Sequence, residues 1–148
     1  MIQKRILMVC LGNICRSPLA EGLLKSKVDS DFIFVDSAGT SAFHRGELPD
    51  KRSITIARKY NMDITNQKSR QFIAADFEIF DTIYVMDHSN KNNVLALAKN
   101  NNDRNKVKLI LSEIQDHSLD VPDPYYDNGF DNVYQMLNKA CTKIANNL

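Results

Sequence analysis

Near its start the chain reads ILMVCLGNICRSP over residues 6–18. Ile6–Val9 form a short continuous apolar run, which is typical of a strand buried on both faces. From Pro18 to Val28, leucines recur at helical spacing. The stretch therefore predicts a strand, a tight loop that begins at Cys10, and a helix. Repetition of this unit builds a parallel sheet, because parallel neighbours need crossover connections.

The same alternation continues along the chain. Further strands are predicted at 32–35, 82–86 and 107–111, further helices at 50–60 (N-capped by Asp50), 73–80, 89–99 and 129–145, and a polar connector at 100–105. These elements predict an α/β fold: a single three-layer domain, with a four-stranded parallel sheet and helices on both faces. Ligands bind such sheets at the carboxyl ends of the strands, so the candidate residues follow Val9, Val35, Met86 and Leu111.

The composition narrows the class of protein. The 148 residues are 43% hydrophobic and 25% charged, which is typical of a globular domain and not of a disordered tail. No apolar stretch approaches the ~20 residues of a membrane-spanning helix, and no secretory leader is recognised at the start. Three cysteines, an odd number, do not suggest a disulfide scaffold. We therefore expect a cytoplasmic protein, and a net charge of +1 gives no sign of a nucleic-acid or membrane partner.

The charges are unevenly distributed. Residues 1–70 contain twelve Lys or Arg and seven Asp or Glu, whereas residues 71–148 contain seven and eleven. Between Leu109 and Asn138 there are six acids and no Lys or Arg. This pattern fits a basic first half that receives an anion and an acidic segment supplied by the second half. Solvated charged faces produce the same asymmetry, so both interpretations stay open.

The loop after the first strand has the features of an oxyanion site. Gly12 and Asn13 tolerate positive φ, so successive amides can turn inward, and the following helix adds its positive dipole end. Arg16 can grip two oxygens with its planar fork, and the positive field favours the thiolate of Cys10. Ser17 and Pro18 suit the N-cap and first residue of the helix. The alternative for Cys10 is a small buried residue at the strand end. For Ser17 the alternatives are plain helix capping and capping together with a hydrogen bond to the Cys10 thiolate.

A proton donor is predicted in the acidic segment. A cysteine phosphoryl-transfer site needs an acid for its leaving group. If that group is a tyrosyl oxygen, whose conjugate acid has a pKa of ~10, its departure without a proton is slow, so a general acid is required. Asp123 lies between two prolines, which stiffen the loop that presents it. An ordinary turn aspartate is the alternative for this position.

Taken together, residues 10–18 and the run Asp123–Tyr126 resemble the low-molecular-weight protein tyrosine phosphatases, and so do residues 36–40, 49–50, 69–71 and 86–90. The resemblance covers the whole chain, 1–148, as one phosphatase domain of the phosphotyrosine phosphatase I-like fold. It implies that Cys10 is the nucleophile and forms a phosphocysteine, that Arg16 clamps the phosphate, and that Asp123 acts first as acid and then as base. It implies no metal and no cofactor, and phosphotyrosine in proteins or peptides as substrate.

The resemblance also names the binding residues. Phosphate or another oxyanion is expected in the loop, and substrate binding is predicted for Leu11, Gly12, Asn13, Ile14, Cys15, Ser17, Phe43, Tyr125 and Tyr126. The aromatic side chains would wall a slot for a phenyl ring, although Phe43 also suits a core position. Relatives that act on phosphoarginine carry Thr where this chain has Ile14, so the apolar side chain favours phosphotyrosine. A reversible disulfide between Cys10 and Cys15 is implied as well.

Some positions depart from the family or have no assigned role. Gln67 stands where many relatives have His. His44, His88 and His117 are predicted to be ordinary surface or loop residues. Asp87 is predicted either to cap the next helix or to support the loop.

Two other functions are compatible with the same motifs. Arsenate reduction uses a similar loop but needs further cysteines, and only Cys141 is spare. A phosphotyrosine-binding module without catalysis is the second alternative, against which the complete set of Cys10, Arg16 and Asp123 argues.

Overall fold

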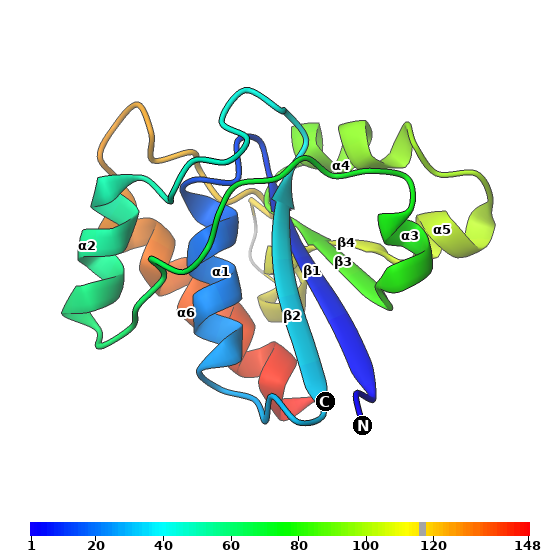
Figure 1. Cartoon of the computed structure of the whole chain (residues 1–148), viewed down its shortest axis with the longest axis horizontal. Helices are drawn as coiled ribbons and strands as arrows, with labels where there is room; N and C mark the ends of the chain where they lie inside the picture. Colours follow the sequence, from blue (N-terminus) through cyan, green and yellow to red (C-terminus); the bar gives the residue numbers. More distant parts are fainter. Residues whose placement is uncertain (116–117) are drawn as a thin grey trace.

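The computed structural model describes residues 1–115 and 118–148, and it contains a four-stranded, all-parallel sheet. The strands are β1 (Lys4–Cys10), β2 (Ile33–Gly39), β3 (Thr82–Val85) and β4 (Val107–Leu109). Their order across the sheet is β2-β1-β3-β4, so β1 and β3 are neighbours although they are distant in sequence. The carboxyl ends of the strands lie at the top of Figure 1. The predicted four-stranded parallel sheet is confirmed.

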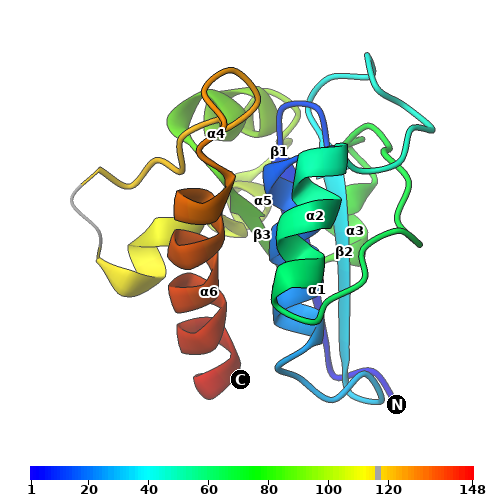
Figure 2. The ribbon, with the colours of Figure 1, turned by 90° about the vertical axis from the view of Figure 1, so that its left-hand side faces the viewer.

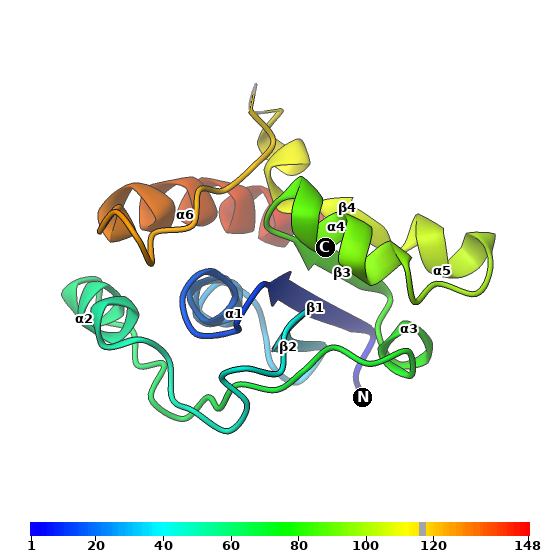
Figure 3. The same cartoon turned by 90° about the horizontal axis from the view of Figure 1, so that it is seen from above.

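Helices cover both faces of the sheet, as Figure 3 shows from above. One face carries α1 (Arg16–Lys25), α2 (Lys51–Lys59), α6 (Phe130–Asn146) and the 3-10 helix η1 (Ile110–Ile114), and the other carries α3 (Asp76–Ile79), α4 (His88–Leu95) and α5 (Asn101–Asn105). Figure 2 shows α2 in front of α1, with α6 beside them. The result is the predicted three-layer α/β domain.

Strand β1 explains why the sheet lies between two cores. Its side chains alternate between the faces: Ile6 and Met8 belong to the cluster formed with α1 and α6, whereas Leu7 and Val9 belong to the cluster formed with α3 and α4. All four are buried. A central parallel strand must therefore be apolar throughout, which is the pattern found in the sequence.

Helix α6 closes the domain with one apolar face. The five side chains predicted to form this face are all buried: Val133, Leu137, Ala140, Cys141 and Ile144. The remaining positions of α6 are largely polar, so the helix packs against α1 and η1 with its apolar face.

Three local predictions were wrong. Residues 101–105 form the short helix α5, which begins after Asn100 because the Asn100 side chain accepts a hydrogen bond from the Asp103 amide. The fourth strand ends at Leu109, where the chain turns into η1. Helix α1 begins at Arg16 with Cys15 as its N-cap, so Ser17 lies inside the first turn and does not cap it. Pro18 is tolerated there because first-turn amides have no partner within the helix.

The loops that follow β1 and precede α6 meet above the carboxyl ends of the strands (Figure 1). In the part of the chain that the structure describes, no helix is long and apolar enough to cross a membrane.

Candidate active site

The loop of residues 11–15 wraps around the sulfur of Cys10. Asn13 adopts the left-handed conformation (φ 57°), and its amide donates a hydrogen bond to Cys10 Sγ at 3.3 Å. Among the described residues, none accepts a hydrogen bond from the amides of Gly12, Ile14 or Cys15. These amides are therefore available for an oxyanion above the sulfur.

Gly12 has a different role from the one predicted. Its φ is not positive, but a Cβ at this position would lie 2.9 Å from Cδ2 of His44, so any larger residue here would require the His44 ring to shift. The absence of a side chain lets the His44 ring approach the loop closely.

Ser17 supplies a second hydrogen bond to the sulfur. Its Oγ lies 3.0 Å from Cys10 Sγ and accepts a hydrogen bond from Asn13 Nδ2 at 2.8 Å. The sulfur is closer to this hydroxyl than the Ala38 carbonyl oxygen, which lies 3.5 Å from Ser17 Oγ. The Asn13 amide and the Ser17 hydroxyl thus both lie within hydrogen-bonding distance of Cys10 Sγ.

A buried hydrogen-bond chain holds these two donors in place. Asn13 Nδ2 also donates to Ser37 Oγ at 3.0 Å, and Ser37 Oγ donates to Glu21 Oε1 at 2.6 Å. Lys25 lies at the surface end of the chain and donates to Glu21 Oε2 at 2.6 Å. Burial raises the pKa of Glu21, although the hydrogen bonds from Lys25 and Ser37 act in the opposite direction. Neither Glu21 nor Ser37 was predicted from the sequence to belong to the site. Ser37 lies in one of the segments that carry the resemblance, whereas Glu21 gave no signal.

Arg16 lies in the first turn of α1 and is 2% exposed. Its Nη1 donates to Asp87 Oδ2 at 2.7 Å and to the Val121 carbonyl at 2.9 Å. Burial alone would lower the pKa of Arg16, but the nearby Cys10 and Asp87 raise it. Asp87 also caps α4 through the Asn90 amide at 2.8 Å, so both predicted roles of Asp87 hold.

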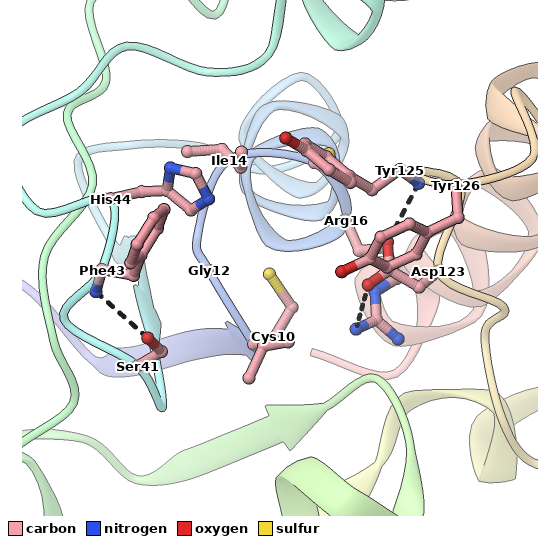
Figure 4. A pocket seen from close by; sticks show the side chains of 12 residues that line it. Cys10, Gly12, Ile14, Arg16, Ser41, Phe43, His44, Asp123, Tyr125 and Tyr126 are labelled. Carbon is pink, nitrogen blue, oxygen red and sulfur yellow. Dashed lines mark hydrogen bonds and ion pairs between the residues drawn. The ribbon is translucent and has the colours of Figure 1, made fainter.

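Asp123 reaches the site from the loop before α6. The Val121 amide donates to the Met86 carbonyl, which fastens this loop to the end of β3. Asp123 Oδ2 lies 3.7 Å from Arg16 Nη2, and Asp123 Oδ1 accepts from the Tyr125 amide at 3.0 Å (Figure 4). The carboxylate is therefore held beside the guanidinium, with part of its surface open to a ligand.

These groups share one cavity of about 370 Å³, which is drawn in Figure 4. It is lined by Cys10, Leu11, Gly12, Ile14, Cys15, Arg16, Ser41, Phe43, His44, Asp123, Tyr125 and Tyr126. The side chains of Asn13 and Ser17 do not line it; they lie buried beneath the loop. An apolar cavity with a few converging polar groups is the usual form of a small-molecule site.

Three aromatic side chains surround the cavity. Phe43 and Tyr126 are each 83% exposed, so Phe43 is not a core residue. Tyr125 is 40% exposed, and its ring contacts that of Tyr126 at a centroid distance of 5.1 Å. Ile14, which is 7% exposed, adds an apolar surface near the sulfur. A planar ring therefore has apolar partners on two sides.

The comparisons with known proteins agree with this geometry. A family model described as low molecular weight phosphotyrosine protein phosphatase matches residues 5–148. The chain is 37% identical to the low molecular weight phosphotyrosine protein phosphatase of Sus scrofa over 147 residues, covering 95% of this chain and 92% of that protein. The chain belongs to the low molecular weight phosphotyrosine protein phosphatase family.

Two solved structures illustrate the range of this fold. Wzb of Vibrio vulnificus in complex with benzylphosphonate has a TM-score of 0.87 and 31% identity, with 98% of this chain and 99% of that chain covered. DARP, a Drosophila arginine phosphatase, has a TM-score of 0.89 and 30% identity, with 98% of this chain and 97% of that chain covered.

Gln67, the departure from many phosphatases of this family, still forms a hydrogen bond. Its Nε2 donates to the Pro18 carbonyl at 3.0 Å and so supports the first turn of α1. His44 lies in a loop, as predicted, but it also lines the cavity. Its ring packs edge-on against Phe43 at a centroid distance of 4.8 Å, and its Nδ1 lies 3.0 Å from Glu47 Oε2. His88 is exposed and pairs with Asp120; His117 lies outside the described residues.

All three cysteines of this phosphatase are buried free thiols. Burial, with a contribution from Asp50, raises the pKa of Cys15 to about 12, so this thiol is neutral at pH 7. The Cys10–Cys15 disulfide stays a prediction. Within residues 1–115 and 118–148, no group of three or more His, Cys, Asp or Glu is placed to hold a metal ion.

Proposed function

We propose that this protein hydrolyses phosphotyrosine in proteins or peptides through a phosphocysteine intermediate. The observation that carries the proposal is the arrangement at Cys10: two donors converge on its sulfur at the floor of an apolar cavity, beside Arg16 and Asp123. The family match over nearly the whole chain supports the same activity.

In the first step, the loop amides and Arg16 hold the phosphate oxygens. Cys10 Sγ attacks phosphorus and forms the S–P bond, while the bond from phosphorus to the tyrosyl oxygen breaks and its electron pair moves to that oxygen. Asp123, in its protonated form, gives its proton to the departing oxygen. Tyrosine leaves, and Asp123 becomes a carboxylate.

In the second step, water attacks the phosphocysteine. The Asp123 carboxylate takes a proton from the water as the new P–O bond forms. The P–S bond breaks and its electron pair returns to Cys10 Sγ, where the Ser17 hydroxyl and the Asn13 amide stabilise the thiolate. Inorganic phosphate leaves, and the protonation states return to those at the start.

The walls of the cavity select the substrate. Ile14, Phe43 and Tyr125 offer apolar surfaces to a phenyl ring, whereas a phosphoserine side chain is too short to contact them when its phosphate lies in the loop. The substrate is therefore a phosphorylated aryl group.

The alternatives find less support in the residues around the site. Arsenate reduction needs a second reactive thiol, but Cys141 is fully buried on α6, where burial raises its pKa to about 12. A phosphotyrosine-binding module without catalysis would not need a general acid, whereas here Asp123 Oδ2 lies 3.7 Å from Arg16 Nη2.

We also propose that residues 1–148 form one phosphatase domain that works without a metal or a cofactor. Three unpaired cysteines suit the reducing cytoplasm, where we place the protein. A net charge of +1 favours neither nucleic acid nor a membrane surface as partner.

The test is an assay with three substrates. Release of phosphate from p-nitrophenyl phosphate and from a phosphotyrosine peptide, with at least about a hundredfold lower kcat/KM for the matched phosphoserine peptide, is expected. A protein that binds the phosphotyrosine peptide without turnover would be the silent module. Arsenate-dependent thiol oxidation with no hydrolysis would instead identify the reductase.

A further inference from the structure

Arg52, in the first turn of α2, lies between two aromatic rings of the segment that follows Asp123. Its guanidinium carbon is 5.3 Å from the centre of the Tyr125 ring and 4.7 Å from that of the Phe130 ring. Its Nη1 donates to Asn128 Oδ1 at 2.8 Å. One side chain of α2 thus contacts two residues of the loop before α6 and the first residue of α6 itself.

Asp50 fixes the other side of this guanidinium. Arg52 Nε and Nη2 donate to the two carboxylate oxygens of Asp50, each at 3.1 Å. Burial would raise the pKa of Asp50, but the hydrogen bonds from Arg52 lower it, so Asp50 is ionised at neutral pH. The Asp50 amide also donates to the Ile14 carbonyl at 2.8 Å, which joins the same residue to the phosphate loop. A bidentate pair of this kind sets the orientation of the guanidinium plane.

Tyr125 connects Arg52 to the general acid. The Tyr125 ring rests on the Arg52 guanidinium. The Tyr125 amide donates to Asp123 Oδ1 at 3.0 Å (Figure 4). Only Pro124, whose φ is fixed by its ring, separates the two residues. A change in the position of the Tyr125 ring is therefore transmitted to the Asp123 carboxylate.

Arg52 does not itself reach the reacting atoms. It is not among the residues that line the catalytic cavity, and it borders a second cavity of about 350 Å³ together with Thr55, Ile56, Lys59, Asn128, Phe130 and Asp131. Each of its three nitrogens donates a hydrogen bond to Asp50 or Asn128. Arg52 therefore acts on catalysis indirectly, through the residues that it contacts.

We propose that Arg52 is a positioning residue of the phosphatase: it holds Tyr125 as a wall of the cavity and, through the Tyr125 backbone, orients Asp123 for proton transfer. This inference rests on the proposed hydrolytic function. It predicts a selective defect, because only substrates whose leaving group needs a proton depend on the orientation of Asp123.

The experiment compares kcat/KM for phenyl phosphate and 2,4-dinitrophenyl phosphate, since this ratio reports the step in which the leaving group departs. In Arg52→Met, kcat/KM is expected to fall about tenfold for phenyl phosphate and less than about twofold for the dinitrophenyl ester. Arg52→Lys keeps a cation beside the rings but lacks the planar fork, so a smaller defect of the same selectivity is expected. Arg58→Met, on an exposed position of the same helix, is the control and should change neither value.

A double-mutant cycle with Asp123→Ala separates positioning from general damage. If Arg52 acts through Asp123, adding Arg52→Met to Asp123→Ala changes the phenyl phosphate value by less than about twofold. Equal slowing of both esters, or full additivity with Asp123→Ala, would overturn the inference. If Arg52→Met does not fold, as judged by thermal melting, Arg52→Lys decides by the same criterion. An inactive wild type would instead refute the proposed function.

Discussion

The Ser17 hydroxyl oxygen lies 3.0 Å from the Cys10 sulfur, and both residues are buried. Asn13 Nδ2 donates a hydrogen bond to the same hydroxyl oxygen at 2.8 Å. The Ser17 side chain of α1 thus holds the nucleophile. Asn13 also donates to Ser37 of β2, so Ser17 is fixed in turn from the neighbouring strand. This arrangement leads to a first prediction.

Ser17→Ala removes the hydroxyl donor to the thiolate. A hydrogen bond to a charged group contributes about 1.5–3 kcal/mol, so kcat/KM for p-nitrophenyl phosphate should fall at least about tenfold. Ser26→Ala, at the other end of the same helix, is the matched control, because the Leu23 carbonyl is the only hydrogen-bond partner of its hydroxyl among the described residues. Unchanged kinetics in Ser17→Ala would remove the hydroxyl from the mechanism.

Cys10→Ser separates binding from chemistry. The hydroxyl of serine is a far weaker nucleophile than a thiolate, so turnover should become undetectable. Binding of benzylphosphonate, measured by calorimetry, should persist because the loop amides and Arg16 are unchanged. In Arg16→Met, by contrast, the affinity for benzylphosphonate should fall by at least about tenfold, because the guanidinium that grips the phosphonate oxygens is lost. Residual turnover in Cys10→Ser would point to another nucleophile.

Asp123→Ala tests the general acid. The expected fall in kcat/KM is about a hundredfold for phenyl phosphate and less than about threefold for 2,4-dinitrophenyl phosphate, whose leaving group departs without a proton. Asp127→Ala serves as control, since this carboxylate lies in the same loop and contacts the Gly129 amide. Equal slowing of the two esters would be inconsistent with an acid role for Asp123.

Ile14→Thr tests the apolar surface beside the sulfur. A hydroxyl in the cavity should favour a polar guanidinium group over a phenyl ring, so the ratio of kcat/KM for phosphoarginine to that for phosphotyrosine should rise about tenfold. Ile14→Val has nearly the same shape as Thr but no hydroxyl, so it isolates polarity from size. If Val and Thr shift the ratio equally, polarity at residue 14 does not set the preference.

Glu21→Gln should change how stability depends on pH. Because the pKa of Glu21 is raised in the folded state, the wild type binds more protons when folded, and its free energy of unfolding decreases as the pH rises above the ordinary value of 4.5. The decrease ends once the pH exceeds the raised pKa. Urea unfolding between pH 4 and 8 should therefore show that the wild type loses stability relative to Glu21→Gln as the pH increases.

The control for this effect is Glu78→Gln, at an exposed position of α3. Its stability should run parallel to that of the wild type over the same pH range. Parallel curves for Glu21→Gln as well would show that the Glu21 carboxyl group does not contribute this proton linkage.

Local backbone signals in the sequence were enough to predict most elements. The apolar run before Cys10 placed β1, and the apolar spacing after Gly129 placed α6. Asp50 caps α2 as expected, accepting a hydrogen bond from the Arg52 amide. Residues 101–105 were missed because a short polar helix has no apolar period to reveal it, and its cap at Asn100 was the only signal.

By itself, the sequence determined the strand, loop and helix around Cys10 and the presence of a carboxylate suited to proton transfer, because these depend on neighbouring residues. Only the tertiary structure decided which distant groups meet there. The strand order places β3 beside β1, which brings Asp87 to Arg16 and lets the Val121 carbonyl accept from the same guanidinium. Strand β2, on the other side, brings Ser37 to Asn13. The spacing of apolar residues in the sequence predicts which side chains are buried, but the pairing of the strands decides which groups a buried polar side chain contacts.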